Sequence, residues 1–272
     1  VTVNGKNFFI TYAGDTDSND VVLTPAPAPT TVYVDATFTG DGTVDGDQEA
    51  ANSQDATLGR DAFATIADAL NALSTTESAT LIINSGTYGA LDLSGFTNDV
   101  TIKFVEGNSS ITSLTGGANV AIHLDDDAEH SFATTLTVGD DTDTTYSGTI
   151  SGTGGLTKTG SGILTLTGTS TFSGATAVDN GTLRLNKSGA SFNAGLFTNT
   201  SSITIATNAT LEVTSSWNVK DTTPVVVNGG VLHVTSAANY LNDLTLNDGA
   251  LISGNLFRVG YSRDASITVG GS

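Results

Sequence analysis

The chain has 272 residues, of which 38% are hydrophobic, with 31 glycines, 4 prolines and no cysteine. This composition excludes disulfide bonds and cysteine-ligated zinc, and it favours many short strands and tight turns over helices. The net charge of −19 lies in residues 1–146, where 22 acidic residues outnumber 3 basic ones (3 − 22 = −19), whereas residues 147–272 hold 6 of each. So acidic a surface repels nucleic acid and anionic lipid.

Residues 1–24 are predicted to form two strands around an acidic turn. Two short strands are marginal in water without a partner, so we expect them to add to an exposed sheet edge, on this chain or on a second molecule. The residues expected to make that contact are Phe8, Phe9, Val21 and Val22. Residues 25–31 (PAPAPTT) follow as an extended, semi-rigid linker.

Residues 32–80 are predicted to form a cap. The pattern indicates a strand over Val32–Val34, an acidic loop, and then an amphipathic helix from about Asp61 to Leu73, with Asp61 as its N-cap. The apolar stripe of this helix consists of Phe63, Ile66, Leu70 and Leu73.

Residues 81–272 are predicted to form the coils of a right-handed parallel β-helix. Strand, small-residue turn and strand recur to the end of the chain, and such units bury a face only by stacking. Aligning Leu183, Leu211, Leu232 and Leu251 gives steps of 28, 21 and 19 residues, a reasonable length for one coil. The fold class is therefore all-β, a β-solenoid with one capping helix and a short N-terminal strand pair.

Two segments resemble known families. Residues 152–185 (GTGGLTKTGSGILTLTGTSTFSGATAVDNGTLRL) resemble the autotransporter-associated β-strand repeat, also called the passenger-associated transport repeat, of bacterial surface proteins. The order YVD, F-x-T-I-x-x-A-L and LIINSGTYGALDL, ending at Leu93, resembles the N-terminal cap and first coil of pectin-lyase-like β-helices. Both resemblances imply a right-handed β-helix, and the first implies an exported passenger displayed outside the cell.

The acidic half offers oxygen ligands for a hard cation. The spaced set Asp35, Asp41, Asp45 and Asp47 suits calcium, which takes 6 to 8 oxygens from a flexible loop. The run at residues 125–130 (DDDAEH) is a second place for such an ion. No cofactor is required by the sequence, and calcium is the one candidate ion, confined to this half.

One group of residues could support polysaccharide cleavage. Lys103 and His123 lie on adjacent predicted coils, near the carboxylates of residues 125–129. Lyase and hydrolase chemistry needs a base beside such carboxylates, but both basic residues are also typical of outward strand positions. Elsewhere, Trp217, Tyr240 and Tyr261 would stack on sugars if they formed an exposed stripe.

The sequence favours a non-catalytic, structural and adhesive segment of a bacterial surface protein, as a stalk, matrix or filament-forming β-helix. The alternative is a polysaccharide-active, pectate-lyase-like enzyme or a carbohydrate-binding module. Expected partners are further copies of the chain, through strand addition or end-to-end stacking, and a surface glycan. No membrane insertion is expected, because no apolar run reaches the ~18 residues of a spanning helix. The expected location is extracellular, at the cell surface.

Overall fold

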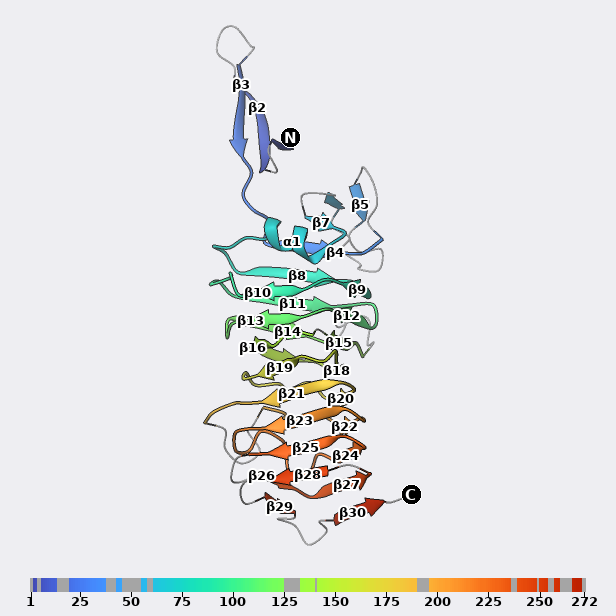
Figure 1. The fold of residues 1–272 in the computed structure, drawn as a ribbon. Coiled ribbons are helices and arrows are strands. Elements are labelled where there is room, and N and C mark those ends of the chain that lie inside the picture. The colour runs from blue at the N-terminus through green and yellow to red at the C-terminus, as the bar shows by residue number, and fades with distance from the viewer. Residues whose placement is uncertain are drawn as a thin grey trace.

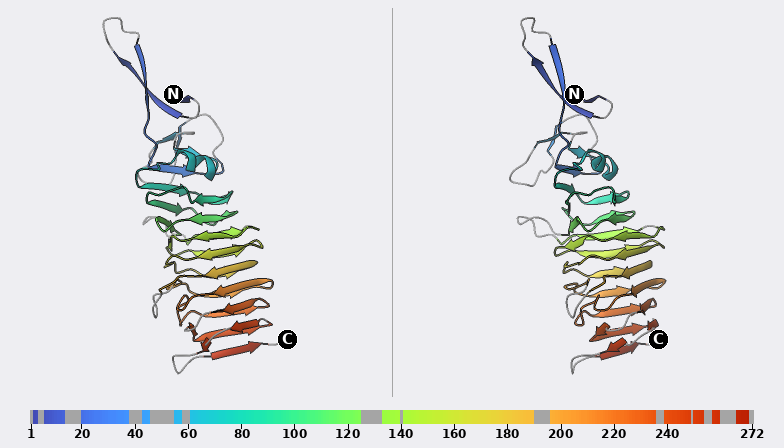
Figure 2. Two further views of the ribbon diagram at one scale, coloured as in Figure 1. Left: turned by 60° about the vertical axis from the view of Figure 1, so that its left-hand side comes forward. Right: turned by 90° about the vertical axis from the view of Figure 1, so that its left-hand side faces the viewer.

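The computed structural model forms a long stack of coils with a hairpin at its N-terminal end (Figure 1). Both views in Figure 2 show the same single stack. The structure describes residues 2–3, 6–13, 20–37, 43–45, 55–57, 61–124, 133–139, 141–189, 196–235, 239–248, 250–253, 257–259 and 266–270.

The N-terminal hairpin is a small antiparallel sheet. It consists of β1 (Thr2–Val3), β2 (Lys6–Ala13) and β3 (Asp20–Pro25). Phe8 and Phe9 lie opposite Pro25 and Thr24, and Val21 and Val22 lie opposite Tyr12 and Thr11. No described strand of the solenoid joins this sheet, so pairing with a second molecule is the part of the strand-addition prediction that remains.

Three parallel sheets build the solenoid. The first contains β4 (Thr31–Val34), β7 (Ala62–Phe63), β8 (Ala79–Ile83), β11 (Val100–Phe104), β14 (Val120–His123) and β17 (Thr149–Ser151). The second contains β10 (Leu91–Leu93), β13 (Leu114–Gly116), β16 (Thr144–Tyr146), β19 (Ile163–Leu166), β21 (Gly181–Leu185), β23 (Ala209–Val213), β25 (Val231–Val234) and β28 (Ala250–Ser253). The third contains β9 (Gly86–Tyr88), β12 (Ser109–Ile111), β15 (Thr135–Gly139), β18 (Gly155–Thr159), β20 (Thr176–Val178), β22 (Ile203–Ile205), β24 (Val225–Asn228), β27 (Asp243–Asn247) and β30 (Ser266–Gly270).

Two smaller pairs flank the stack. β5 (Thr43–Asp45) and β6 (Asp55–Thr57) are antiparallel, whereas β26 (Asn239–Leu241) and β29 (Phe257–Val259) are parallel. The first face also continues past β17 through single parallel bridges, from Ile150 to Ser170, Phe197 and Val219 in turn. The fold is therefore the predicted all-β parallel solenoid.

The core consists of the inward-facing side chains of the three sheets, because alternate residues of a strand point to the same face. Along the second sheet, Leu183 pairs with Leu211, Leu211 with Leu232, and Leu232 with Leu251, so the predicted alignment of these leucines is confirmed. Buried apolar residues run without interruption from Val32 to Leu244 in one cluster.

The capping helix is shorter than predicted. α1 spans Ile66–Ala72, and its N-cap is Thr65 rather than Asp61. The Thr65 hydroxyl accepts a bond from the Asp68 backbone N–H (3.1 Å), which caps the helix, and it donates to the Asp68 carboxylate (2.7 Å). The preceding residues pair instead as β7 with β4, and this pairing holds them extended.

Helix α1 lies over the β4 end of the stack with Ile66, Ala69 and Leu73 buried beneath it (Figure 1). It therefore covers apolar side chains that would otherwise face water at that end. Among the residues that the structure describes, no helix has the length and apolar character needed to cross a lipid bilayer.

Tyr146 and Lys158 are the two largest side chains that carry a polar group into the core. The Tyr146 hydroxyl is 3.1 Å from the carbonyl oxygens of both Val120 and Thr149, and burial raises the pKa of this tyrosine well above its ordinary value. Lys158 is 2% exposed and lies in the inward row between Val138 and Val178. Its ammonium group donates to the carbonyl oxygens of Thr159 and Gly160, the latter at 2.8 Å. A buried charge needs such partners.

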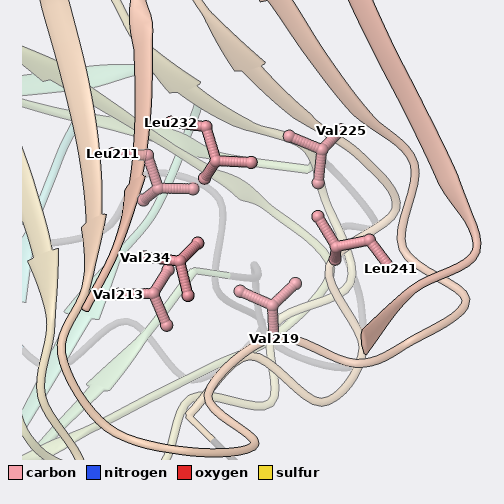
Figure 3. Close-up of a pocket in the computed structure, with 7 residues that line it drawn as sticks. All are labelled: Leu211, Val213, Val219, Val225, Leu232, Val234 and Leu241. Atoms are coloured by element: carbon pink, nitrogen blue, oxygen red, sulfur yellow. The ribbon is translucent and has the colours of Figure 1, made fainter. Parts of the chain in front are cut away.

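A small void of about 10 Å³ remains in the core of the C-terminal coils (Figure 3). Only leucine and valine side chains line it: Leu211, Val213, Val219, Val225, Leu232, Val234 and Leu241. The space is about that of one water molecule, but a buried water needs polar partners. We therefore regard this void as a packing defect rather than a ligand site.

Candidate functional site

Lys103 and His123, the two basic residues that the sequence placed on adjacent coils, lie in register in the first sheet. Lys103 of β11 is directly opposite His123 of β14, and His123 is opposite Ser151 of β17. The Ser151 hydroxyl is 3.0 Å from the His123 Nδ1 atom. All three side chains are half-buried on the outer face. The carboxylates of residues 125–129, which the prediction placed beside them, lie outside the described residues.

A hydroxyl next to an imidazole is one requirement of nucleophilic catalysis, but not the only one. A third group must orient the histidine, and free N–H donors must stabilise the developing oxyanion. β14 pairs with β11 on one side and with β17 on the other, so the backbone N–H groups of β14 are used in hydrogen bonds between strands. The void in Figure 3 offers no substrate pocket beside this row, because it is lined by residues between Leu211 and Leu241, far along the chain from Lys103, His123 and Ser151. The row alone does not make an active site.

The acidic set predicted to bind calcium is described only in part. Asp35 follows β4, and its Oδ1 atom accepts bonds of 2.7 Å from both the backbone N–H and the hydroxyl of Thr37. Its Oδ2 atom accepts a bond of 3.0 Å from the Asn84 amide. This carboxylate therefore fastens its own turn to the next coil. Asp45 lies in β5, whereas Asp41 and Asp47 lie outside the described residues.

No described cluster of three or more histidine, aspartate or glutamate side chains has an arrangement that would hold a metal ion. Asp35 is among these described residues, whereas residues 38–42 and 46–54, on either side of β5, are not. Calcium binding in the acidic half accordingly stays a prediction.

The second sheet carries a charged row that the sequence prediction missed. Glu212 lies between Arg184 and His233 on three successive strands, with its carboxylate 2.5 Å from the Arg184 Nε atom and 3.5 Å from the His233 Nδ1 atom. Each residue follows one of the aligned leucines, so the leucine register already placed all three on the outer face. Partly exposed ion pairs contribute little to stability, ~1 kcal/mol or less.

The third sheet has an outer row without charge. Its central positions on successive strands are Thr87, Ser110, Thr137, Thr157, Ala177, Thr204, Val226, Thr245 and Thr268. Hydroxyl and methyl groups therefore repeat at the strand spacing of about 4.8 Å. Such a row presents a flat and uniform surface instead of a cleft.

These features define a class of protein: a three-faced parallel β-solenoid whose polar and charged side chains lie in flat outer rows. Residues 156–185 match the model of the passenger-associated-transport-repeat, as the sequence indicated. The match begins in β18 at Leu156 and ends at Leu185 in β21, both buried, so it corresponds to the strands β18, β19, β20 and β21. No curated protein and no solved structure matches the chain.

The matched repeat is a structural repeat of autotransporter passengers, not an enzyme family, and it implies a secreted or surface-exposed passenger. The resemblance of the N-terminal cap to pectin-lyase-like β-helices is not confirmed by these comparisons. The matched residues include the buried Lys158. They also include Gly181, and the backbone φ of +65° at Gly181 favours glycine.

Proposed function

We propose that this chain is a non-catalytic, adhesive spacer of a bacterial surface protein, held outside the cell as an autotransporter-passenger-like stalk or matrix element. The observation that carries the proposal is the unbroken parallel register of the solenoid, with a passenger repeat at its centre. A stack of this kind gains length in proportion to its number of coils, which suits a spacer.

The outer faces support the same proposal. The third sheet offers an uncharged row of hydroxyl and methyl groups, and the second offers partly exposed ion pairs. Flat rows of this kind can contact an extended surface, whereas most enzymes enclose a small substrate in a concave pocket.

Surface display tests the proposal. Residues 1–272 would replace the passenger of an autotransporter whose β-barrel is known to export foreign segments, and intact cells would be treated with protease. We expect a folded, protease-accessible passenger on the cell surface and an increase in attachment of these cells to glycan-coated or abiotic surfaces. A passenger that is exported and folded but leaves attachment unchanged would refute the adhesive role.

The second candidate, a polysaccharide-active enzyme, is favoured only by the register of Lys103, His123 and Ser151. We predict no turnover of polygalacturonate or related polymers, because the row of Lys103, His123 and Ser151 contains no carboxylate, and both hydrolysis and lyase chemistry need carboxylates beside the base. The measurement is the release of unsaturated products or reducing ends. Turnover that disappears in His123→Ala and in Lys103→Ala, but persists in the neighbouring variant Thr101→Ala, would reverse the ranking of the two functions.

Strand addition by the hairpin is a further part of the proposal. Removing residues 1–25 is expected to abolish self-association while the solenoid stays folded, because β2 and β3 pair only within their own described sheet. The deletion stops before Thr30, whose carbonyl accepts a bond from the Thr80 N–H. Light scattering measures assembly, and circular dichroism checks the fold. Multimers that persist unchanged would show that the hairpin is only a connector.

Calcium is expected to raise the melting temperature if the loop around β5 binds it. At a calcium concentration 100 times the dissociation constant, binding adds about 2.7 kcal/mol to the free energy of unfolding. The matched comparison is the double variant Asp41→Asn with Asp47→Asn, which removes two of the predicted ligands. Magnesium serves as the control ion, because it demands a tighter octahedral geometry. Equal melting temperatures in calcium and in chelator would remove the calcium site from the proposal.

A further inference from the structure

The turn after β23 holds the chain's one tryptophan in an unfavourable backbone conformation. Trp217 has φ of +61°, in the left-handed region that bulky side chains rarely adopt. Its side chain is half-buried, at a corner between the second sheet and the bridge at Val219. Asparagine and glycine adopt this conformation far more readily. The choice of tryptophan here opposes the local preference.

The neighbouring Asn218 explains how the conformation persists. Its side chain is completely buried, and its Nδ2 atom donates to the carbonyl oxygens of Ser215 (2.7 Å) and Ser216 (3.3 Å). The same amide reaches Lys187 on the preceding coil, with Oδ1 accepting from its N–H at 3.0 Å and Nδ2 donating to its carbonyl at 3.4 Å. Strained residues last only where surrounding contacts fix them, and they concentrate at functional sites.

The loop fastened to this turn brings polar groups to the same corner. The Ser215 hydroxyl donates to the Asn186 side-chain oxygen at 3.0 Å, which leaves the exposed Asn186 amide free to donate. The Lys187 side chain is half-buried and forms no ion pair with any described residue. An indole, an amide donor and an ammonium group therefore lie on two adjoining loops that three hydrogen bonds hold together.

We infer that this corner is a glycan-binding site, in which the indole of Trp217 stacks on the apolar face of a pyranose ring. A rigid aromatic ring supplies a large contact at little cost in conformational entropy, while the Asn186 and Lys187 donors bond to ring hydroxyls or a carboxylate. The inference rests on the adhesive role proposed above and names its ligand.

The chain's own fluorescence tests the inference, because Trp217 is its one tryptophan. The full chain would be titrated with a neutral cello-oligosaccharide and, separately, with an oligogalacturonate, after labelled protein has been applied to a broad glycan array. We expect a saturable fluorescence change with at least one pyranose oligomer. Preference for the oligogalacturonate would assign the Lys187 ammonium to a carboxylate, whereas equal affinities would assign the site to neutral rings.

Two variants separate binding from folding. Trp217→Asn is expected to weaken glycan binding more than about tenfold while its melting temperature is unchanged or higher, because asparagine accepts a left-handed φ. Trp217→Phe keeps a stacking surface and is expected to retain partial binding. Absence of binding to every pyranose on the array, or binding that Trp217→Asn leaves intact, would overturn the inference. Surface display and attachment to abiotic surfaces do not depend on this outcome.

Discussion

Alanine at Gly154 is expected to disrupt the centre of the solenoid. A Cβ atom at this position would lie 1.8 Å from the carbonyl oxygen of Thr134 and 2.4 Å from that of Leu124. Both atoms belong to the backbone of the preceding coil, so no side-chain rotation relieves the contact. We expect a loss of about 3 kcal/mol or more, because overpacking of this kind forces the coils apart.

Gly95 provides a matched control for this substitution. A Cβ atom there would meet nothing within 4 Å, so Gly95→Ala is expected to change stability by ~0.5 kcal/mol or less. Denaturant unfolding measures both variants, and hydrogen exchange locates the loosened coils. Equal stabilities for the two variants would mean that the coils are spaced more widely at Gly154 than the structure shows.

Truncating Leu211 to alanine is the second large effect that we expect. This side chain is completely buried, lies between Leu183 and Leu232 in the leucine row, and lines the dry void of Figure 3. The new cavity would join that void instead of collapsing. The expected loss is about 2 to 5 kcal/mol, the range for buried leucine truncations.

The neighbouring residue Thr210 is the control, since it lies on the same strand but points outward. Thr210→Ala is expected to cost ~0.5 kcal/mol or less, as for an ordinary surface substitution. Thermal unfolding with local hydrogen exchange would compare the two. A Leu211→Ala protein as stable as Thr210→Ala would contradict the assigned register of the second sheet.

Much of the fold was predictable because the leucine row repeats its environment on every coil. Leu183, Leu211 and Leu232 each precede a polar residue and follow a small-residue turn, and that pattern sets the strand pairing. Lys103 and His123 were predicted only to lie on adjacent coils, and the structure places them directly opposite each other. Parallel register is thus readable wherever one face of each strand is clearly apolar.

Other features depend on contacts that no local pattern reports. The helix was predicted to start at Asp61, but pairing of β7 with β4 overrides the helical periodicity of Phe63. Lys158 was not identified as a core residue, because its burial depends on carbonyl groups of the following turn. The φ of Trp217 depends on Asn218 and on a loop from the preceding coil.

The leucine register also has a kinetic meaning. Each coil touches mainly the coils before and after it, so the loop that must close to add one coil spans only about twenty residues, a modest entropic cost. Helix α1 contacts β4 and β7 and seals that end of the core. Wherever the first coils form, each further strand meets a finished template, so a chain supplied gradually can add its coils one after another.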